Sequence, residues 1–187
     1  MRPSSRTKIL DAAIRVTERE GITSLTLDAA AEEAGVTKGG LLYHFRTRDE
    51  LLVAIQRHLT EAWEERLLAE LGRPHEEATA RERVAAYARL AMRGGTSKAD
   101  LAFMLESAHQ PELAQVWYQL MERWLPELAE PRPDQADLLL AWLAADGLWM
   151  FEATTRVKLA PAVKEALHQR ITALAESSSD TSPRGKA

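Results

Sequence analysis

The chain has 187 residues, no cysteine and a net charge of -4 at pH 7. The absence of cysteine excludes disulfides, thiolate catalysis and cysteine-ligated zinc or iron-sulfur sites. The acidity belongs to residues 59–187, with 15 Lys/Arg against 20 Asp/Glu, whereas residues 1–58 carry 9 against 8, so nucleic-acid binding by the N-terminal part is not excluded.

The sequence predicts a cytoplasmic protein without a membrane segment. Residues 1–8 are polar and basic and lack the apolar stretch of a secretory signal. The most apolar segment, 138–151, contains Asp146 and is shorter than the roughly 20 residues that a bilayer requires. Its length indicates a buried helix.

Helix-forming residues dominate and strand signals are nearly absent, which predicts an all-α fold of about nine helices. The first helix is expected over 5–20, before a glycine that stops it. The second and third are short, over 26–34 and 37–45, and the threonines Thr26 and Thr37 are their N-caps.

A long fourth helix is expected to begin at the capping box Thr47-Arg48-Asp49-Glu50 and to end at Gly72. Beyond it, apolar spacing and turn signals predict five more helices, over 79–93, 99–108, 111–125, 134–155 and 161–176. Residues 177–187 are expected to form a disordered tail.

The second and third helices are joined by Ala34-Gly35-Val36-Thr37, which is the spacing of a helix-turn-helix. This geometry presents the third helix outward, where its N-terminal residues reach base edges in the major groove of B-DNA. Adjacent glycines cost a helix about 1 kcal/mol each relative to alanine, so stability does not explain Gly39-Gly40. Close approach to DNA explains the pair, and a simple loop is the alternative.

This segment resembles the N-terminal signature of the TetR family, without gaps over residues 6–55. The matching positions are Thr26, Ala30-Ala31, Ala34-Gly35-Val36-Thr37, Gly39, Leu41, His44-Phe45, Arg48 and Leu51. The resemblance implies a transcriptional regulator, not an enzyme, that needs no cofactor. It also implies a DNA-binding domain over 1–47 and a helical ligand-binding and dimerisation domain over 48–176.

The resemblance further implies a role for individual residues. Those expected to contact DNA are Thr26 and Arg48 as phosphate anchors, Thr37, Lys38, Gly39, Gly40 and Tyr43 in the groove, and His44 on the backbone. Thr26 and Thr37 are expected to serve as N-caps as well, because a capping hydroxyl can also lie near a phosphate.

Two positions depart from the family pattern. Leu42 stands where the family usually has a tyrosine, two residues before the histidine, and Tyr43 follows it. Arg48 stands where the family has a lysine, which keeps the charge and adds bidentate geometry. Both departures concern contacts with the operator, not the fold.

The C-terminal part is rich in tryptophan and methionine, which suit a pocket for a small apolar effector. The predicted lining residues are Phe103, Met104, Trp117, Met121 and Trp124, with Glu106 or His109 as a polar anchor. Ordinary core packing is the alternative for each of them.

The segments 134–155 and 161–176 are the expected dimer surface, because the first is apolar nearly all round and one face of it must be covered. The resemblance implies a four-helix bundle made from two copies. Two recognition helices about 34–36 Å apart fit successive major grooves of palindromic double-stranded DNA. A repressor released by its effector is the preferred interpretation.

Two other classes of protein compete with this interpretation. A metal-dependent enzyme would use the pairs Glu106/His109 and Glu165/His168, which each place a carboxylate and an imidazole on one helix face. An architectural DNA binder would keep the helix-turn-helix and lack an effector.

Overall fold

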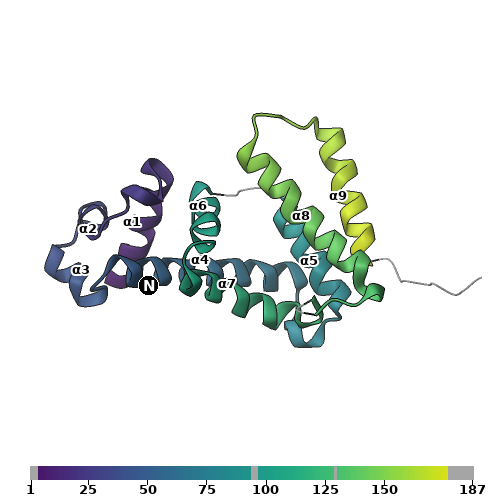
Figure 1. The fold of residues 1–187 in the computed structure, drawn as a ribbon, viewed down its shortest axis with the longest axis horizontal. Coiled ribbons are helices and arrows are strands. Elements are labelled where there is room, and N and C mark those ends of the chain that lie inside the picture. The colour runs from purple at the N-terminus through teal and green to yellow at the C-terminus, as the bar shows by residue number, and fades with distance from the viewer. Residues whose placement is uncertain (1–3, 94–96, 129, 177–187) are drawn as a thin grey trace, which may run out of the picture. The chain divides into compact units, whose positions relative to one another are not determined.

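The structure is a computed structural model that describes residues 4–93, 97–128 and 130–176. Over these ranges it contains nine α-helices, four short 3-10 helices and no strand, which confirms the predicted all-α fold (Figure 1). The predicted tail, 177–187, lies outside the described residues.

Each predicted helix is confirmed to within two residues at either end. The helices are α1 (Ser5–Glu20), α2 (Leu27–Ala34), α3 (Lys38–His44), α4 (Arg48–Leu71), α5 (Ala80–Met92), α6 (Lys98–Ser107), α7 (Pro111–Trp124), α8 (Ala136–Thr154) and α9 (Pro161–Glu176). The 3-10 helices, which the sequence analysis did not predict, are η1 (Ile22–Ser24), η2 (His75–Glu77), η3 (Pro126–Leu128) and η4 (Pro133–Gln135).

The chain forms two compact units, residues 1–65 with 95–121 and residues 66–94 with 122–187. This division differs from the boundary after residue 47 that the sequence suggested. Phe103 of α6 and Leu113 of α7 belong to the same buried cluster as side chains of α1 and α4, so two later helices pack with the N-terminal ones. Residues 48–65 of α4 belong to the first unit, and the rest of α4 belongs to the second.

The core of the first unit holds the short helices in place. Its buried side chains include Ile9, Leu10, Val16, Leu25, Leu41, Phe45, Leu51 and Ile55. Each buried side chain of this size contributes roughly 1.5–3 kcal/mol relative to an exposed one. Leu41 and Phe45 anchor α3 by one side only, which leaves the other side of this helix free.

The second unit is built on α5, α8 and α9, which pack against one another (Figure 1). Arg83 of α5 is buried, and its guanidinium donates to the carbonyl oxygens of Trp124 and Ala78 and to the carboxylate of Glu127. The Trp124 ring stacks on His75 at 5.3 Å between centroids. Arg83 thus joins the end of α7 to the segment that leads into α5.

None of the helices in the described ranges combines the length and the apolar character that crossing a bilayer requires.

Candidate nucleic-acid interface

The turn between α2 and α3 has the backbone geometry of a helix-turn-helix. Gly35 adopts the left-handed conformation, with φ 63° and ψ 36°, and its N–H donates to the carbonyl oxygens of Ala31 and Glu32. The N–H of Val36 donates to the Ala31 carbonyl at 3.0 Å. A residue with a Cβ is strained at this φ, so the glycine is what allows α3 to follow α2 after so short a turn.

α2 is also fixed to α1 by charge. The guanidinium groups of Arg15 and Arg19 each lie 2.9 Å from the Glu33 carboxylate, and these hydrogen bonds lower the pKa of Glu33 below its usual value. Both arginines are about half exposed, so each ion pair contributes little to the stability of the fold. Their charges are directed at α2 and not at an outside partner.

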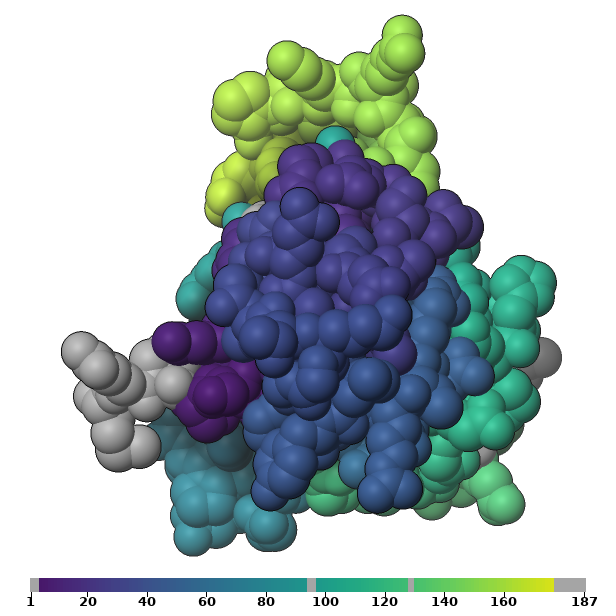
Figure 2. Space-filling model, turned by 90° about the vertical axis from the view of Figure 1, so that its left-hand side faces the viewer, coloured from purple at the N-terminus to yellow at the C-terminus, as the bar shows by residue number. Residues whose placement is uncertain are grey.

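The outward side of α3 carries most of the residues predicted to face the groove. Leu41 and Phe45 are buried, whereas Tyr43 is 86% exposed. Thr37, Lys38, Gly39 and Gly40 are also exposed. In the space-filling view, α2 and α3, coloured dark blue, lie at the front (Figure 2).

Thr26 and Thr37 are N-caps, as predicted. Thr26 Oγ1 accepts the Ala29 N–H at 3.0 Å, and Thr37 Oγ1 accepts the Gly40 N–H at 3.1 Å. A hydroxyl that accepts in this way keeps its own proton for donation. Both side chains are exposed, so that proton is available to a phosphate oxygen.

Gly39 has no steric reason for lacking a side chain within the protein. A Cβ built at this position has no atom within 4 Å, and the residue lies in the first turn of α3. At Gly40 the same Cβ would approach the capping hydroxyl of Thr37 at 3.2 Å. The bare backbone at Gly39 therefore fits close approach by an outside molecule better than it fits internal packing.

Lys38 is held by an acid of its own motif. Its Nζ lies 2.9 Å from Asp28 Oδ1, and the two side chains are 63% and 67% exposed. An ion pair this exposed contributes at most about 1 kcal/mol to stability, and its partners readily exchange one another for other groups. Lys38 is thus neutralised in the free protein and available to a phosphate or a base that offers better geometry.

Arg48 makes contacts that the sequence did not predict. Its Nε donates to the carbonyl oxygen of Leu25 and its Nη2 to that of Ile22, both at 2.8 Å. Ile22 is the first residue of η1, and Leu25 follows η1 directly before Thr26, the cap of α2. Two of the donors expected to anchor a phosphate are therefore used within the protein.

The start of α4 is capped in a modified way. The Glu50 N–H donates to Thr47 Oγ1 at 3.1 Å, as the predicted capping box requires, but the Glu50 carboxylate accepts from the Arg46 N–H at 2.7 Å. The acid reaches one residue beyond the cap. This contact fixes the bend between α3 and α4.

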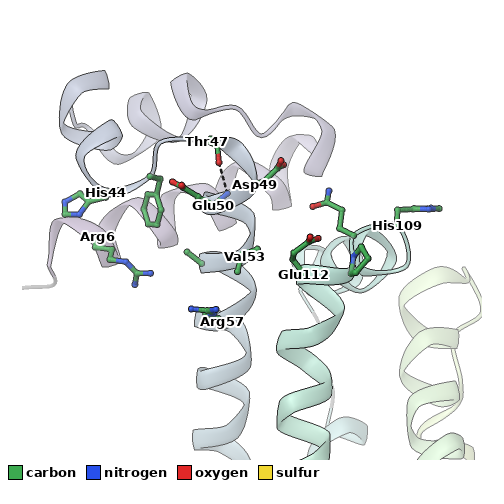
Figure 3. A pocket seen from close by; sticks show the side chains of 13 residues that line it. Arg6, His44, Thr47, Asp49, Glu50, Val53, Arg57, His109 and Glu112 are labelled. Carbon is green, nitrogen blue, oxygen red and sulfur yellow. Dashed lines mark hydrogen bonds between the residues drawn. The ribbon is translucent and has the colours of Figure 1, made fainter.

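His44 lines a cleft of about 700 Å³ in the first unit (Figure 3). Arg6 and His44 lie on one side of the first turns of α4, and His109 and Glu112 approach from the other. The Arg6 guanidinium lies over the Phe45 ring at 5.4 Å from its centroid, a cation–π contact. Arg6 was not among the predicted contact residues, although the basic N-terminal cluster contained it.

The residues predicted to line an effector pocket do not form one group. Phe103 is 1% exposed and belongs to the core of the first unit, so its position fits the core-packing alternative. Trp124 belongs to the second unit, where it stacks on His75. Met121 is also buried, at 7% exposure.

The other predicted pocket residues reach the surface of the first unit. Met104 is 39% exposed, and Trp117 is half-buried. The Glu106 carboxylate accepts a hydrogen bond from the Gln110 amide. His109 is exposed and lines the cleft of Figure 3.

The residues of the metal-enzyme alternative do not gather into a metal site. Glu106 and His109 belong to the first unit, whereas Glu165 and His168 belong to the second. Glu165 is exposed and accepts from the Gln169 amide at 2.8 Å. Over the described ranges, no three His, Asp or Glu side chains lie close enough together to hold a metal ion.

Comparison with known proteins gives matches over most of the chain. Residues 9–55 match the model of bacterial regulatory proteins of the tetR family, and residues 81–176 match a tetracyclin repressor-like C-terminal domain. The HTH-type transcriptional regulator BetI of Cronobacter sakazakii is 30% identical over 163 residues, which is 80% of each chain. BetI of Paraburkholderia phymatum is 31% identical over 173 residues, covering 80% of this chain and 82% of that one.

Solved structures of the multidrug binding protein EbrR have a similar fold. Its complex with imidazole has a TM-score of 0.65 at 28% identity and covers 92% of this chain and 96% of the other. Its complex with ethidium has a TM-score of 0.63 at 26% identity and covers 93% of this chain and 99% of the other.

Proposed function

The chain belongs to the TetR family of bacterial transcriptional regulators, and from this membership we propose that it is a repressor that binds a palindromic operator as a homodimer and leaves it when a small molecule binds. It is a DNA-binding regulator and not an enzyme. A dimer bound over a promoter blocks polymerase without needing a second surface. Its site of action is then the cytoplasm, where the promoter is.

α3 is proposed to enter the major groove with its N-terminal end foremost. The observation that carries this assignment is the exposed side of α3, where Gly39 has no internal neighbour and Tyr43 exposes 86% of its surface beside Lys38. An exposed aromatic ring and a bare backbone have no role in the free protein's core. Both suit close contact with bases and sugars.

The residues on either side of the exposed face of α3 are proposed to contact the DNA backbone. Thr26 and Thr37 offer hydroxyl protons at helix N-termini, where the first amides also favour a phosphate. His44 lies at the other end of α3. Arg48 is proposed to act through the protein, by holding η1 and the cap of α2, because its donors are bonded to carbonyl oxygens there.

The proposed dimer surface is the exposed apolar side of α8, together with α9. Leu140, Leu143, Met150 and Phe151 are 36–56% exposed and recur at helical spacing on this side. Val163 of α9 is 48% exposed. Water-exposed leucine and phenylalanine in one stripe favour association, and a second copy would cover them with the same stripe.

The effector is proposed to be a small organic molecule. The solved complexes of EbrR contain imidazole and ethidium, which supports this class of ligand for a related chain. Of the pocket residues predicted from sequence, Met104, Glu106, His109 and Trp117 remain candidates, because each is at least partly exposed.

The DNA-binding proposal is tested by titrating labelled DNA from upstream of the gene with the protein at about 50 and 200 mM salt. Wild type should bind tightly and lose affinity as the salt rises, and Lys38→Ala should bind at least tenfold more weakly. Lys98→Ala is the matched control, because Lys98 is an exposed lysine on α6 of the same unit. Failure to prefer any sequence, also in a selection from random DNA, would overturn the proposal.

The dimer is tested by sedimentation of the wild type and of Leu143→Glu. Leu143 is 56% exposed, and Leu105 of α6 is 59% exposed, so Leu105→Glu adds the same charge at an equally exposed leucine of the first unit, to which α8 does not belong. Wild type and Leu105→Glu should sediment as dimers and Leu143→Glu as a monomer. A monomeric wild type at micromolar concentration would contradict the dimer.

A further inference from the structure

One side of α8 combines acidic and aromatic side chains. Leu138, Ala141, Ala145 and Leu148 face the core of the second unit, and the apolar stripe of the proposed dimer surface is exposed. Between these two sides lies a third, half-buried stripe made of Trp142, Asp146 and Trp149. At a helical repeat of 3.6 residues, the two tryptophans lie one turn before and one turn after the aspartate.

The Asp146 carboxylate has one strong partner, and it is not a cation. Its Oδ1 accepts the hydrogen bond of the Tyr87 hydroxyl from α5. Burial raises the pKa of Asp146 to about 6, and the Tyr87 hydrogen bond opposes this shift without cancelling it. Over the described residues, Asp146 forms no ion pair with a lysine, arginine or histidine. At pH 7.5 this carboxylate is a negative charge in a poorly hydrated place without a counter-ion.

Aromatic residues lie beside this charge or on the same stripe of α8. Tyr87 meets Trp142 edge to face, with 6.2 Å between ring centroids. The faces of indole rings attract cations, and more strongly when water is partly excluded. A carboxylate bonded to a phenol, with one indole one turn before it and another one turn after it on the same helix, is a set of groups that recognises an organic cation by charge and by ring faces together.

We propose that Trp142, Asp146 and Trp149 of α8, with Tyr87 of α5, form the binding site for an organic cation. The cation supplies the counter-ion that Asp146 lacks, and the indoles cover its apolar part. The site takes an organic cation and not a metal ion, because Asp146 is a single carboxylate and no group of three metal-ligating side chains exists in the described part of the chain.

This inference rests on the proposed function, because it names the chemical class of the effector. It places the effector site in the second unit, in place of the first-unit candidates that were predicted from the sequence. The site also lies beside the proposed dimer surface on the same helix. A cation bound between these indoles would change the packing of α8. Because the proposed dimer surface lies on the same helix, binding would then also affect the dimer. The effect on DNA follows from any difference in its affinity for the DNA-bound and free forms.

The test is calorimetric titration of the DNA-free protein with ethidium and, separately, with benzyltrimethylammonium. Both should bind wild type, and Asp146→Asn should weaken both at least tenfold while Tyr87 keeps an acceptor for its hydroxyl. Glu152→Gln is the matched control, because it removes one carboxylate from another side of α8, where Glu152 pairs with Lys164. Trp149→Leu should weaken binding and Trp149→Phe should restore most of it.

An anionic aromatic probe, 8-anilinonaphthalene-1-sulfonate, checks that apolar binding alone is not responsible. Its affinity should not fall in Asp146→Asn. The inference is overturned if neither cation binds wild type, or if Asp146→Asn binds both as tightly as wild type does.

Operator binding is measured separately with benzyltrimethylammonium, since ethidium intercalates into DNA. A protein that binds its operator but neither cation refutes this site alone. A protein that binds both cations but no DNA refutes the regulator. Cation binding that leaves operator affinity unchanged refutes the effector role.

Discussion

The guanidinium of Arg48 donates from Nε to the carbonyl oxygen of Leu25 at 2.8 Å and so ties the first turn of α4 to the residue before the cap of α2. A second donor reaches the Ile22 carbonyl. These bonds join segments more than 20 residues apart in the sequence. The Arg48 side chain therefore helps to fix the orientation of the helix-turn-helix on α4.

Replacing Arg48 with methionine should weaken operator binding about tenfold without changing its dependence on salt. The number of phosphates contacted stays the same, so the slope of log K against log salt is kept, whereas loss of one phosphate contact lowers it by about 0.9. Lys38→Ala, measured in parallel, should lower this slope if Lys38 meets a phosphate. An equal fall in slope for Arg48→Met would identify Arg48 as a phosphate ligand after all.

Replacing Gly39 with alanine should leave the protein as stable as wild type, or more stable by up to about 1 kcal/mol, and should weaken DNA binding at least tenfold. Alanine is the better helix former, and its Cβ meets nothing within the protein. Thermal unfolding and DNA titration of the same preparation separate the two effects. Operator affinity within twofold of wild type would show that DNA does not approach this residue closely.

Replacing Asp146 with asparagine should stabilise the protein at pH 7.5 by about 2 kcal/mol and have little effect at pH 4. The folded-state pKa of about 6 lies above the ordinary aspartate pKa of 3.8, so Asp146 keeps its proton to a higher pH in the folded protein than in the unfolded one. Wild type thus loses stability as the pH rises from 4 to 6, and the variant lacks this loss.

Tyr87, the titratable partner of Asp146, has its pKa raised well above the ordinary value and stays protonated throughout this pH range. Urea unfolding at both pH values measures the difference. A variant that is destabilised equally at pH 4 and 7.5 would mean that Asp146 contributes to stability independently of its charge.

Replacing Arg83 with methionine should destabilise the protein by about 2–4 kcal/mol. The substitution leaves the Trp124 and Ala78 carbonyls and the Glu127 carboxylate without their donor in a largely buried place. Arg132→Met is the control, because Arg132 forms an ion pair with Asp134 at the surface and should change stability by less than about 0.5 kcal/mol. Chemical unfolding that gives equal values for the two variants would contradict this account of Arg83.

The helices were predictable because their signals are local. Thr26 and Thr37 cap through residues three positions away, and Gly35 ends α2 within its own turn. Local rules fix such features whatever the rest of the chain does. The helix-turn-helix was therefore visible in the sequence.

The contacts that shape the site were not predictable, because they join distant positions. Arg48 meets carbonyls 23 and 26 residues earlier, and Tyr87 meets Asp146 at a separation of 59 residues. Sequence spacing alone shows a charge but not its partner. The packing of α6 with the N-terminal helices was missed for the same reason.

Pocket residues were the weakest part of the sequence reasoning. Phe103 and Met104 are adjacent and both large and apolar, yet one is 1% exposed and the other 39%. Apolar residues at helical spacing look alike whether they fill a core or line a pocket.

With Lys38 in contact with DNA as proposed, its ion pair with Asp28 bears on how the protein searches a chromosome. A genome offers on the order of a million or more competing sites, so the time a regulator spends at its operator depends on the ratio of specific to nonspecific affinity. Asp28 occupies the lysine until a ligand with better geometry displaces it. On random DNA Lys38 would exchange the Asp28 carboxylate for a phosphate only, so, if Lys38 meets a base at the operator as proposed, the pair would shorten the time that the protein spends bound at nonspecific sites.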